Sequence, residues 1–237
     1  MRLLALDTAT EWCSVALWDA GQVRWRAARS ERGHGGQVLR LLDELLAESG
    51  LALGQFDAIA FGRGPGAFTG VRLAASLTQG LAYSVDRPVI PISDLLASAQ
   101  QALWPPEHTA LSPSRVLVCQ DARMGEVYWG AFERDGQVAV EALPEAVATP
   151  ERVVAGALAW LAVGPAMGAG SGFAAYPVLH EAYADRLHPL MTALAPHARE
   201  IVQLAAHAGL GAARPPAEAQ PVYLRNNVAI AAPDWSV

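Results

Sequence analysis

The chain has 237 residues, of which 52% are hydrophobic and only 17% are charged, with a formal net charge of −6. Such a chain can form one large or two small globular domains, and its low charge indicates that a partner buries some apolar surface. Because phosphate binding needs clustered Lys and Arg, the acidic balance argues against a protein that grips nucleic acid alone. Any role with RNA would therefore need a basic partner.

The sequence shows no sign of a membrane or secreted location. No apolar run reaches the length of a membrane span, and the first residues reach Asp7 too soon for a signal peptide. The two cysteines, Cys13 and Cys119, lie in apolar runs and are predicted to be buried free thiols, as in a reducing compartment. We therefore expect a cytoplasmic protein with no membrane partner.

Strand and helix patterns alternate through the first part of the chain. Short apolar runs predict strands, and apolar residues at helical spacing predict helices. The predicted strands are residues 3–6, 14–18, 23–28, 57–61 and 88–92, and the predicted helices are residues 37–49, 71–84 and 93–103, the last capped by Ser93. The proline-rich stretch 104–113 predicts a linker, which divides the chain into an N-terminal lobe at 1–104 and a C-terminal lobe at 113–237.

The second lobe repeats the opening of the first. Residues 116–121 form an apolar run that ends in Asp121, as residues 3–6 run into Asp7, and Gly-Gln-Val recurs at a hairpin in each half. This repetition predicts two duplicated α/β lobes with mixed sheets, and chance similarity between two short hairpins is the alternative. The glycine-rich stretch 164–172 fits no phosphate motif and is interpreted as a loop.

A glycine-rich turn separates the predicted strand 57–61 from the predicted helix 71–84. Its residues include Gly62, Arg63, Gly64, Pro65, Gly66, Phe68, Thr69 and Gly70. Glycine tolerates backbone angles that other residues resist, so either a ligand approaches the backbone here or a helix packs unusually tightly. The turn partly fits the dinucleotide fingerprint, but it lacks the acidic residue at the end of the next strand and a lysine for a Walker-type loop. A sharp strand-to-helix turn is favoured over nucleotide binding.

Two aspartate turns invite comparison with actin-like and sugar-kinase-like ATPases, whose two lobes each hold phosphate and metal at an Asp-x-Gly turn. The turns here read Asp-Thr-Ala-Thr and Asp-Ala-Arg-Met, so neither has the glycine that lets backbone N–H groups close on a phosphate. The sequence therefore predicts the actin-like, sugar-kinase-like (ASKHA) architecture with degraded phosphate turns. The residues of those turns are Asp7, Thr8, Thr10, Asp121 and Arg123.

No catalytic constellation is visible in the sequence. The chain has no Gly-x-Ser-x-Gly or Cys-x-x-Cys motif, and its six histidines are scattered. A helical metal site needs two histidines on one face, but Val38 stands where a partner of His34 would be. We therefore predict neither a catalytic nor a metal site.

The helices at 37–49 and 71–84 carry more apolar or small residues than one core-facing stripe needs, which indicates burial within the lobe or an interface with another chain.

Five segments together resemble the TsaB (YeaZ) family, which takes part in bacterial synthesis of threonylcarbamoyladenosine on tRNA. The segments are residues 4–10, 62–72, 79–82, 121–128 and 221–227. The resemblance implies the actin-like two-lobed fold. It also implies a non-catalytic scaffold or activating subunit, which pairs with the TsaD transferase for N6-threonylcarbamoylation of adenosine 37 in tRNAs that read ANN codons. It implies no cofactor bound by this chain alone.

The resemblance also implies partners. A TsaD-like catalytic subunit would pair with helices of the first lobe, and a TsaE-like ATPase would dock on the pair. The chain would meet tRNA through this complex and would form a homodimer when alone. The residues expected to contact TsaD, or a second copy, are Leu39, Leu42, Leu46, Arg72, Ala75 and Gln79.

Two other classes of protein remain alternatives. The first is an ATP-binding kinase or ATPase of the actin-like fold. Ala9 and Arg123 argue against it, because they occupy the positions in the two aspartate turns where a phosphate-binding turn has glycine. The second is a glycoprotease-like peptidase, which would need a metal or nucleophile site that the sequence does not show.

Overall fold

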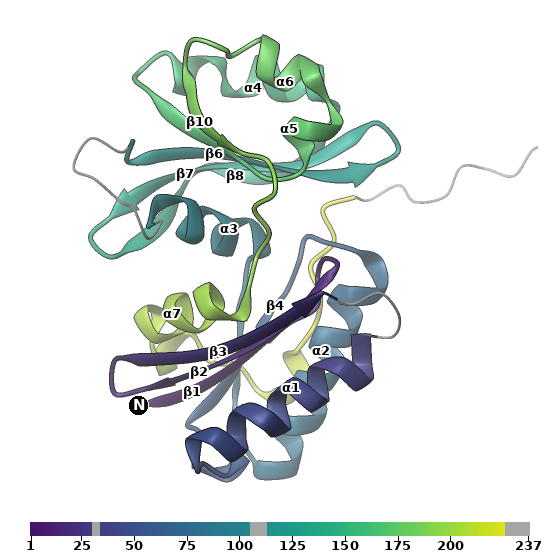
Figure 1. The fold of residues 1–237 in the computed structure, drawn as a ribbon, viewed down its shortest axis with the longest axis vertical. Helices are drawn as coiled ribbons and strands as arrows, with labels where there is room; N and C mark the ends of the chain where they lie inside the picture. Colours follow the sequence, from purple (N-terminus) through teal and green to yellow (C-terminus); the bar gives the residue numbers. More distant parts are fainter. Residues whose placement is uncertain (30–33, 105–112, 226–237) are drawn as a thin grey trace, which may run out of the picture.

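Two five-stranded sheets form the framework of this computed structural model (Figure 1). The structure describes residues 1–29, 34–104 and 113–225. The first sheet has the order β3-β2-β1-β4-β5, with β1 (Arg2–Asp7), β2 (Trp12–Asp19), β3 (Gln22–Arg29), β4 (Ala58–Gly62) and β5 (Val89–Ile92). The second has the order β10-β9-β6-β7-β8, with β6 (Arg115–Arg123), β7 (Glu126–Asp135), β8 (Val138–Ala148), β9 (Ala166–Ala169) and β10 (Leu187–Met191).

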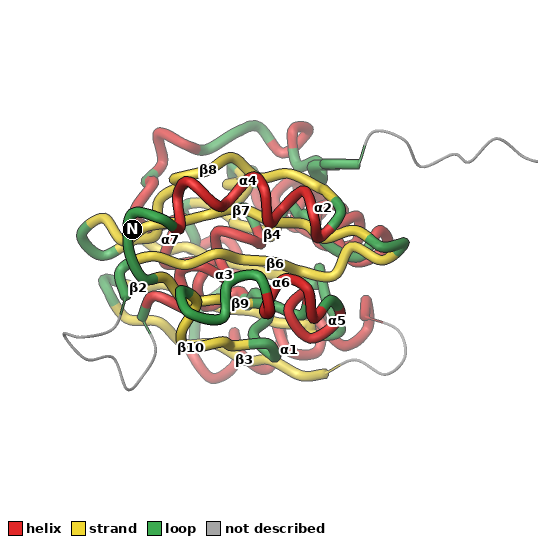
Figure 2. The backbone as a smooth tube through the Cα atoms, turned by 90° about the horizontal axis from the view of Figure 1, so that it is seen from above, coloured by secondary structure: helices red, strands yellow, loops and turns green. Residues whose placement is uncertain are grey.

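The two sheets have the same topology. β1 pairs antiparallel with β2 and parallel with β4, and β6 pairs in the same way with β7 and β9. Leu3 and Leu4 on β1, and Leu117 and Val118 on β6, are all buried, because each central strand is covered on both faces. Seen from above, the strands of both sheets cross the view in roughly the same direction (Figure 2). The prediction of two duplicated α/β lobes of the actin-like, sugar-kinase-like class is confirmed.

Helices cover both faces of each sheet (Figure 1). The outer face of the first sheet carries α1 (His34–Ser49) and α2 (Phe68–Val85), and that of the second carries α4 (Pro150–Leu161), α5 (Gly172–Ala175) and α6 (Pro177–Glu181). Between the sheets lie α3 (Asp94–Leu103) and α7 (Ala198–Ala208). Short 3-10 turns occur at Leu53–Gln55, Leu210–Ala212 and Pro216–Glu218. Within the described ranges, no helix has the length and apolar character of a membrane span.

The two middle helices each pack on the sheet of the other lobe. α3 follows β5, yet its Leu95 and Leu103 belong to the same core as Val116 of β6. α7 follows β10, yet its Ile201 belongs to the same core as Leu3 of β1. The lobes predicted at 1–104 and 113–237 therefore need a correction. A boundary drawn in the sequence groups each helix with the strands that precede it in the chain. In the structure, the apolar faces of α3 and α7 pack against the sheet of the other lobe.

Two predicted segments differ from the structure, and two fall outside it. α2 begins at Phe68, before the predicted residue 71, so Gly70 lies in its first turn. The stretch 164–172, interpreted as a loop, contains β9 and the turn into α5. Most of the predicted linker 104–113 and the last two residues of the motif at 221–227 lie outside the described residues.

Candidate functional site

The glycine-rich turn between β4 and α2 packs directly against the turn that follows β1. A Cβ atom on Gly70 would lie 2.0 Å from the Thr8 carbonyl oxygen, and one on Gly66 would lie 2.7 Å from the Ala9 carbonyl oxygen. The Ala67 N–H donates to the Ala9 carbonyl (2.7 Å), and the Thr8 hydroxyl donates to the Gly70 carbonyl (2.7 Å). Of the two interpretations of this turn, unusually tight packing is the one that the structure has.

Gly70→Ala should lower the free energy of unfolding by roughly 1–3 kcal/mol, because the new methyl group would overlap the Thr8 carbonyl oxygen. Gly80→Ala is a matched control on the same helix, since nothing lies within 4 Å of its Cβ position. That substitution should raise stability by about 0.5–1 kcal/mol through helix propensity. Urea unfolding followed by circular dichroism measures both changes, and equal effects would show that the close contact does not constrain the turn.

Other residues of the turn connect it to α3 and to the second lobe. Gly64 has φ +97°, a conformation that favours glycine, and its N–H donates to Asp94 Oδ2 (2.5 Å). Pro65 follows across a cis peptide bond. The Arg63 guanidinium lies 3.7 Å from Glu145 Oε2 on β8. The turn therefore sits where both lobes and α3 meet.

Two carboxyl groups, Asp7 at the end of β1 and Asp94 at the start of α3, are buried against Gly62. A Cβ atom on Gly62 would lie 2.3 Å from Asp94 Oδ1 and 2.6 Å from Asp7 Oδ1, so only glycine leaves room for them. Burial raises the pKa of Asp7 to about 7. Burial, followed by repulsion from Asp7, raises the pKa of Asp94 well above its usual range. The pair therefore holds a proton near neutral pH.

Asp94 is a site residue that the sequence did not predict. The residue follows the helix cap Ser93, whose hydroxyl accepts the N–H groups of Leu95 and Leu96, and an aspartate in a first helical turn is unremarkable. No sequence spacing links Asp94 to Asp7. The two residues meet only because the order β1-β4-β5 in the sheet brings the start of α3 to the end of β1. A polar side chain at the junction between a predicted strand and a predicted helix was the available signal.

This carboxyl pair should make the stability of the protein depend on pH. Because the native pKa of Asp7 is raised, the protonated pair stabilises the fold fully below the unfolded value of about 4, and this contribution is lost as the pH rises through about 7. Asp94→Asn removes one titrating group and supplies an N–H donor to Asp7. The free energy of unfolding of this variant should therefore change less between about pH 6 and about pH 9.

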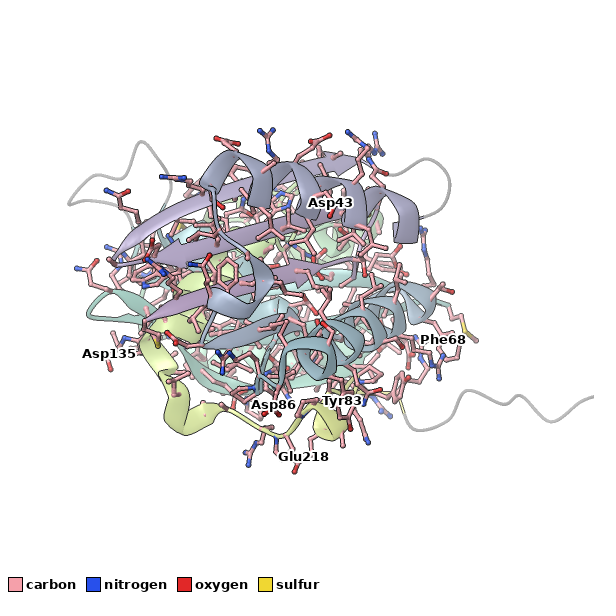
Figure 3. The ribbon with its side chains drawn as sticks, turned by 90° about the horizontal axis from the view of Figure 1, so that it is seen from below. Asp43, Phe68, Tyr83, Asp86, Asp135 and Glu218 are labelled. Carbon is pink, nitrogen blue, oxygen red and sulfur yellow. The ribbon has the colours of Figure 1, made fainter. Side chains whose placement is uncertain are left out.

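Urea unfolding at the two pH values measures this difference. Asp43→Asn is the control, because Asp43 is exposed on α1 (Figure 3). If Asp94→Asn depends on pH as steeply as the unsubstituted chain does, the shared proton is not what stabilises the junction.

The aspartates of both turns hydrogen-bond within their own turn. Asp7 Oδ1 accepts the Ala9 N–H (2.9 Å), and Asp121 Oδ1 accepts the Arg123 N–H (2.8 Å). The Arg123 guanidinium also lies 3.2 Å from Asp121 Oδ2. Thr10 contributes in the same way, because its hydroxyl accepts an N–H two residues on (3.2 Å). These side chains thus stabilise the turns themselves, a role that needs no bound phosphate.

The second lobe has its own counterpart of the glycine-rich turn. A Cβ atom on Gly170 would lie 2.4 Å from the Cys119 carbonyl oxygen, and one on Gly172 would lie 2.8 Å from it. This contact joins the β9–α5 turn to the end of β6, as Gly66 and Gly70 join the β4–α2 turn to the end of β1. The glycine spacing differs between the β4–α2 and β9–α5 turns, so the two turns share no sequence motif. They correspond because each follows the equivalent strand of its lobe.

A cleft of about 1540 Å³ lies between the lobes, and the β4–α2 turn, both aspartate turns and the β9–α5 turn contribute to its wall. The wall residues that the sequence singled out are Thr10, Pro65, Gly66, Phe68, Arg72, Asp121 and Arg123. Thr69 is exposed beside Phe68. The structure therefore brings together, in one cleft, motifs that the sequence showed only as separate turns.

One rim of the cleft carries an arginine that contacts two aromatic rings. The Arg72 guanidinium carbon lies 3.2 Å from the centre of the Phe68 ring and 5.0 Å from that of Tyr223. Phe68 is 61% exposed and Tyr223 47% exposed. We call these three residues the aromatic platform. Both rings contact the same guanidinium, and both are still partly exposed to solvent.

The last described residues run from the first lobe to the second (Figure 1). The Val222 N–H donates to the Arg63 carbonyl (2.7 Å) in the first lobe. In the second lobe, Arg225 Nε donates to Glu126 Oε2 (2.8 Å), and its Nη2 donates to the Ala122 carbonyl (3.1 Å). The segment therefore ties the glycine-rich turn to the β6–β7 turn.

The structure places the predicted partner residues in two groups. Leu39 is 40% exposed on α1, while Leu46, Arg72 and Gln79 are half-buried, and the Gln79 side chain donates to the Pro216 carbonyl (3.1 Å). Leu42 and Ala75, by contrast, are buried in the core of the first lobe. The prediction of direct partner contact is therefore corrected for these two residues, because their side chains already pack against the sheet.

The described residues hold no group of three or more His, Cys, Asp and Glu side chains arranged as a metal site. The prediction of buried free thiols is confirmed for Cys13 and Cys119.

Comparison with known proteins supplies the family. The sequence model of the family described as tRNA N6-adenosine threonylcarbamoyltransferase (TsaD) matches residues 28–232. The tRNA threonylcarbamoyladenosine biosynthesis protein TsaB of Escherichia coli is 39% identical, and the alignment covers 97% of this chain and 96% of that protein. The TsaB protein of Haemophilus influenzae is 42% identical, with 96% and 95% covered.

A solved structure agrees with these sequences. YeaZ from Pseudomonas aeruginosa superposes with a TM-score of 0.81 at 41% identity, which covers 94% of this chain and 99% of that one. Similarity at this level over almost the full length of both chains establishes more than the fold. The chain belongs to the TsaB (YeaZ) family.

Proposed function

We propose that this chain is a non-catalytic subunit that pairs with a TsaD-like transferase and activates it for N6-threonylcarbamoylation of adenosine 37 in tRNAs that read ANN codons. Its relatives are named as threonylcarbamoyladenosine biosynthesis proteins, which supports the reaction. The observation that carries the non-catalytic role is the packing of the first aspartate turn. The Ala9 N–H and carbonyl and the Thr8 hydroxyl all bond within the protein, where an ATPase of this fold would hold phosphate.

The outer face of α2 supports a helix partner. Exposed or half-buried residues recur there at helical spacing, and they are Phe68, Arg72, Ser76, Gly80 and Tyr83. Figure 3 shows Phe68 and Tyr83 near opposite ends of α2. The middle of this face is small, and nothing lies within 4 Å of the Cβ position of Gly80. Aromatic anchors that flank small residues suit the close approach of another helix.

This surface would be completed by Leu39 on the neighbouring α1. In the complex it faces the TsaD-like subunit, and in the isolated chain it faces a second copy. A TsaE-like ATPase would dock on the assembled pair, and tRNA would be bound by the complex. The chain would bind no cofactor alone and would act in the cytoplasm.

Leu39→Glu should abolish pairing, because it would bury a charge in the interface, yet it should not unfold the chain, since Leu39 is already 40% exposed. Leu158→Glu is the matched control, as Leu158 is an exposed leucine on α4 of the other lobe. Light-scattering chromatography of each variant with the TsaD-like subunit gives the mass of the complex. Retention of the complex by Leu39→Glu would exclude this face as the interface.

Transfer of the threonylcarbamoyl group to tRNA tests the function itself. The TsaD-like and TsaE-like subunits are assayed with no added chain, with the unsubstituted chain and with Leu39→Glu. Modification should require the chain and should fall at least about tenfold for the variant, in proportion to the lost complex. Modification that proceeds equally without the chain would remove the proposal.

A further inference from the structure

The interlobe cleft is the basic part of an acidic chain. Four arginines, Arg29, Arg72, Arg123 and Arg225, line it against three carboxyl groups, whereas the whole chain has a net charge of −6. Every one of the 17 basic residues of this chain is arginine. Arginine forms forked hydrogen bonds to phosphate and also stacks on planar rings. The cleft therefore favours an anionic occupant that has flat surfaces.

Two of these arginines are largely exposed to solvent. The side chain of Arg123 is 87% exposed and that of Arg29 is 70% exposed. Each faces one carboxylate, Asp121 at 3.2 Å and Glu11 at 4.0 Å. Ion pairs this exposed are weak and are screened by salt, so a phosphate can compete for the guanidinium.

The aromatic platform adds the flat surface. The Tyr223 ring is 47% exposed, and the Arg72 guanidinium contacts it from α2. Trp12 and Tyr128 line the same cleft. Arginines interleaved with aromatic rings are the pattern by which proteins bind unpaired nucleotides, with the bases stacked and the backbone neutralised.

The volume of the cleft favours a segment of a polymer over a single small molecule as its ligand. Ligand pockets for single small molecules usually have volumes of about 300–1,000 Å³. The cleft here is larger, about 1540 Å³, and it opens between lobes that the segment ending at Arg225 holds together. A short stretch of chain with several phosphates and bases fits these dimensions better than one nucleotide does.

We propose that the interlobe cleft contacts tRNA directly and binds a short single-stranded stretch of it, with Arg29 and Arg123 on the phosphates and the exposed ring of Tyr223 against a base. This proposal rests on the proposed function, which brings tRNA to the complex. In this proposal the chain itself supplies part of the surface that binds tRNA. The proposed function alone requires only that the chain pair with its partner and activate it.

The test uses the complete complex of this chain with its TsaD-like subunit and an unmodified tRNA transcript bearing a fluorophore. Anisotropy titrations at several salt concentrations give the dissociation constant and its salt dependence. The double variant Arg29→Ala/Arg123→Ala should weaken binding about tenfold and should flatten the slope of log K against log salt by about 1.4, since two single-strand phosphate contacts are lost. Tyr223→Ala should weaken binding with the slope unchanged, because stacking releases no counterions.

Arg152→Ala is the control, since it removes the same charge from an exposed arginine on α4 outside the cleft. If the double variant binds the transcript like Arg152→Ala while the complex stays intact, the RNA contact is refuted. If the double variant instead loses its protein partner in light-scattering chromatography, the cleft is a protein-binding site and the proposal is also refuted. If the unsubstituted complex does not form, or forms and does not bind the transcript, the proposed function fails first, which distinguishes the two failures.

Discussion

The close approach of Gly66 and Gly70 to the Thr8 and Ala9 carbonyls is the contact on which the rest of this structure depends. It leaves no room for a side chain at either glycine, and it places the first turn of α2 directly on the end of β1. Because backbone meets backbone there, the direction of α2 is set by hydrogen bonds rather than by adaptable side chains. The outer face of α2 and the inner wall of the cleft therefore have a fixed relation to each other.

Close contact between a glycine-rich turn and the backbone at the end of a central strand occurs in both lobes. In the first lobe the backbone of the aspartate turn bonds with the protein, and the second lobe repeats the arrangement where Gly170 meets Cys119. Below the first turn, Asp7 and Asp94 share a site closed by Gly62, so two acidic groups are buried side by side. The proton held between them lowers the cost of burying two carboxyl groups at the junction of β1, β4 and α3.

Much of this arrangement could be predicted from the sequence, for physical reasons that can be named. The central strands were predictable because burial on both faces demands continuous apolar runs, as at Leu3, Leu4 and Leu117. The duplication was predictable because each lobe repeats an aspartate after its first strand. Leu42 and Ala75 were assigned to a partner because helical periodicity shows how wide an apolar arc is, but not how much of it the chain's own sheet covers.

What the sequence could not show is what depends on tertiary placement. Asp94 joins Asp7 only once β5 and α3 are in position, and the cleft gathers Arg29, Phe68 and Arg123 from elements far apart in the chain. The exchange of α3 and α7 between lobes was hidden for the same reason, since an apolar helix face does not identify which sheet it will cover.

That exchange has a consequence for how the protein is made. The Ala198 N–H donates to the Ser14 hydroxyl oxygen (2.8 Å) across most of the chain, so the sheet that is synthesised first receives its covering helix almost last. Until α7 leaves the ribosome, one face of β1 and β2 has no native cover, and α3 waits with an uncovered apolar face until β6 follows it. Contacts so distant in sequence form slowly, and exposed faces of this kind are where nascent chains aggregate or meet chaperones. The two lobes are therefore not independent folding units, because the core on the inner face of each sheet is completed by a helix that follows the other sheet in the chain.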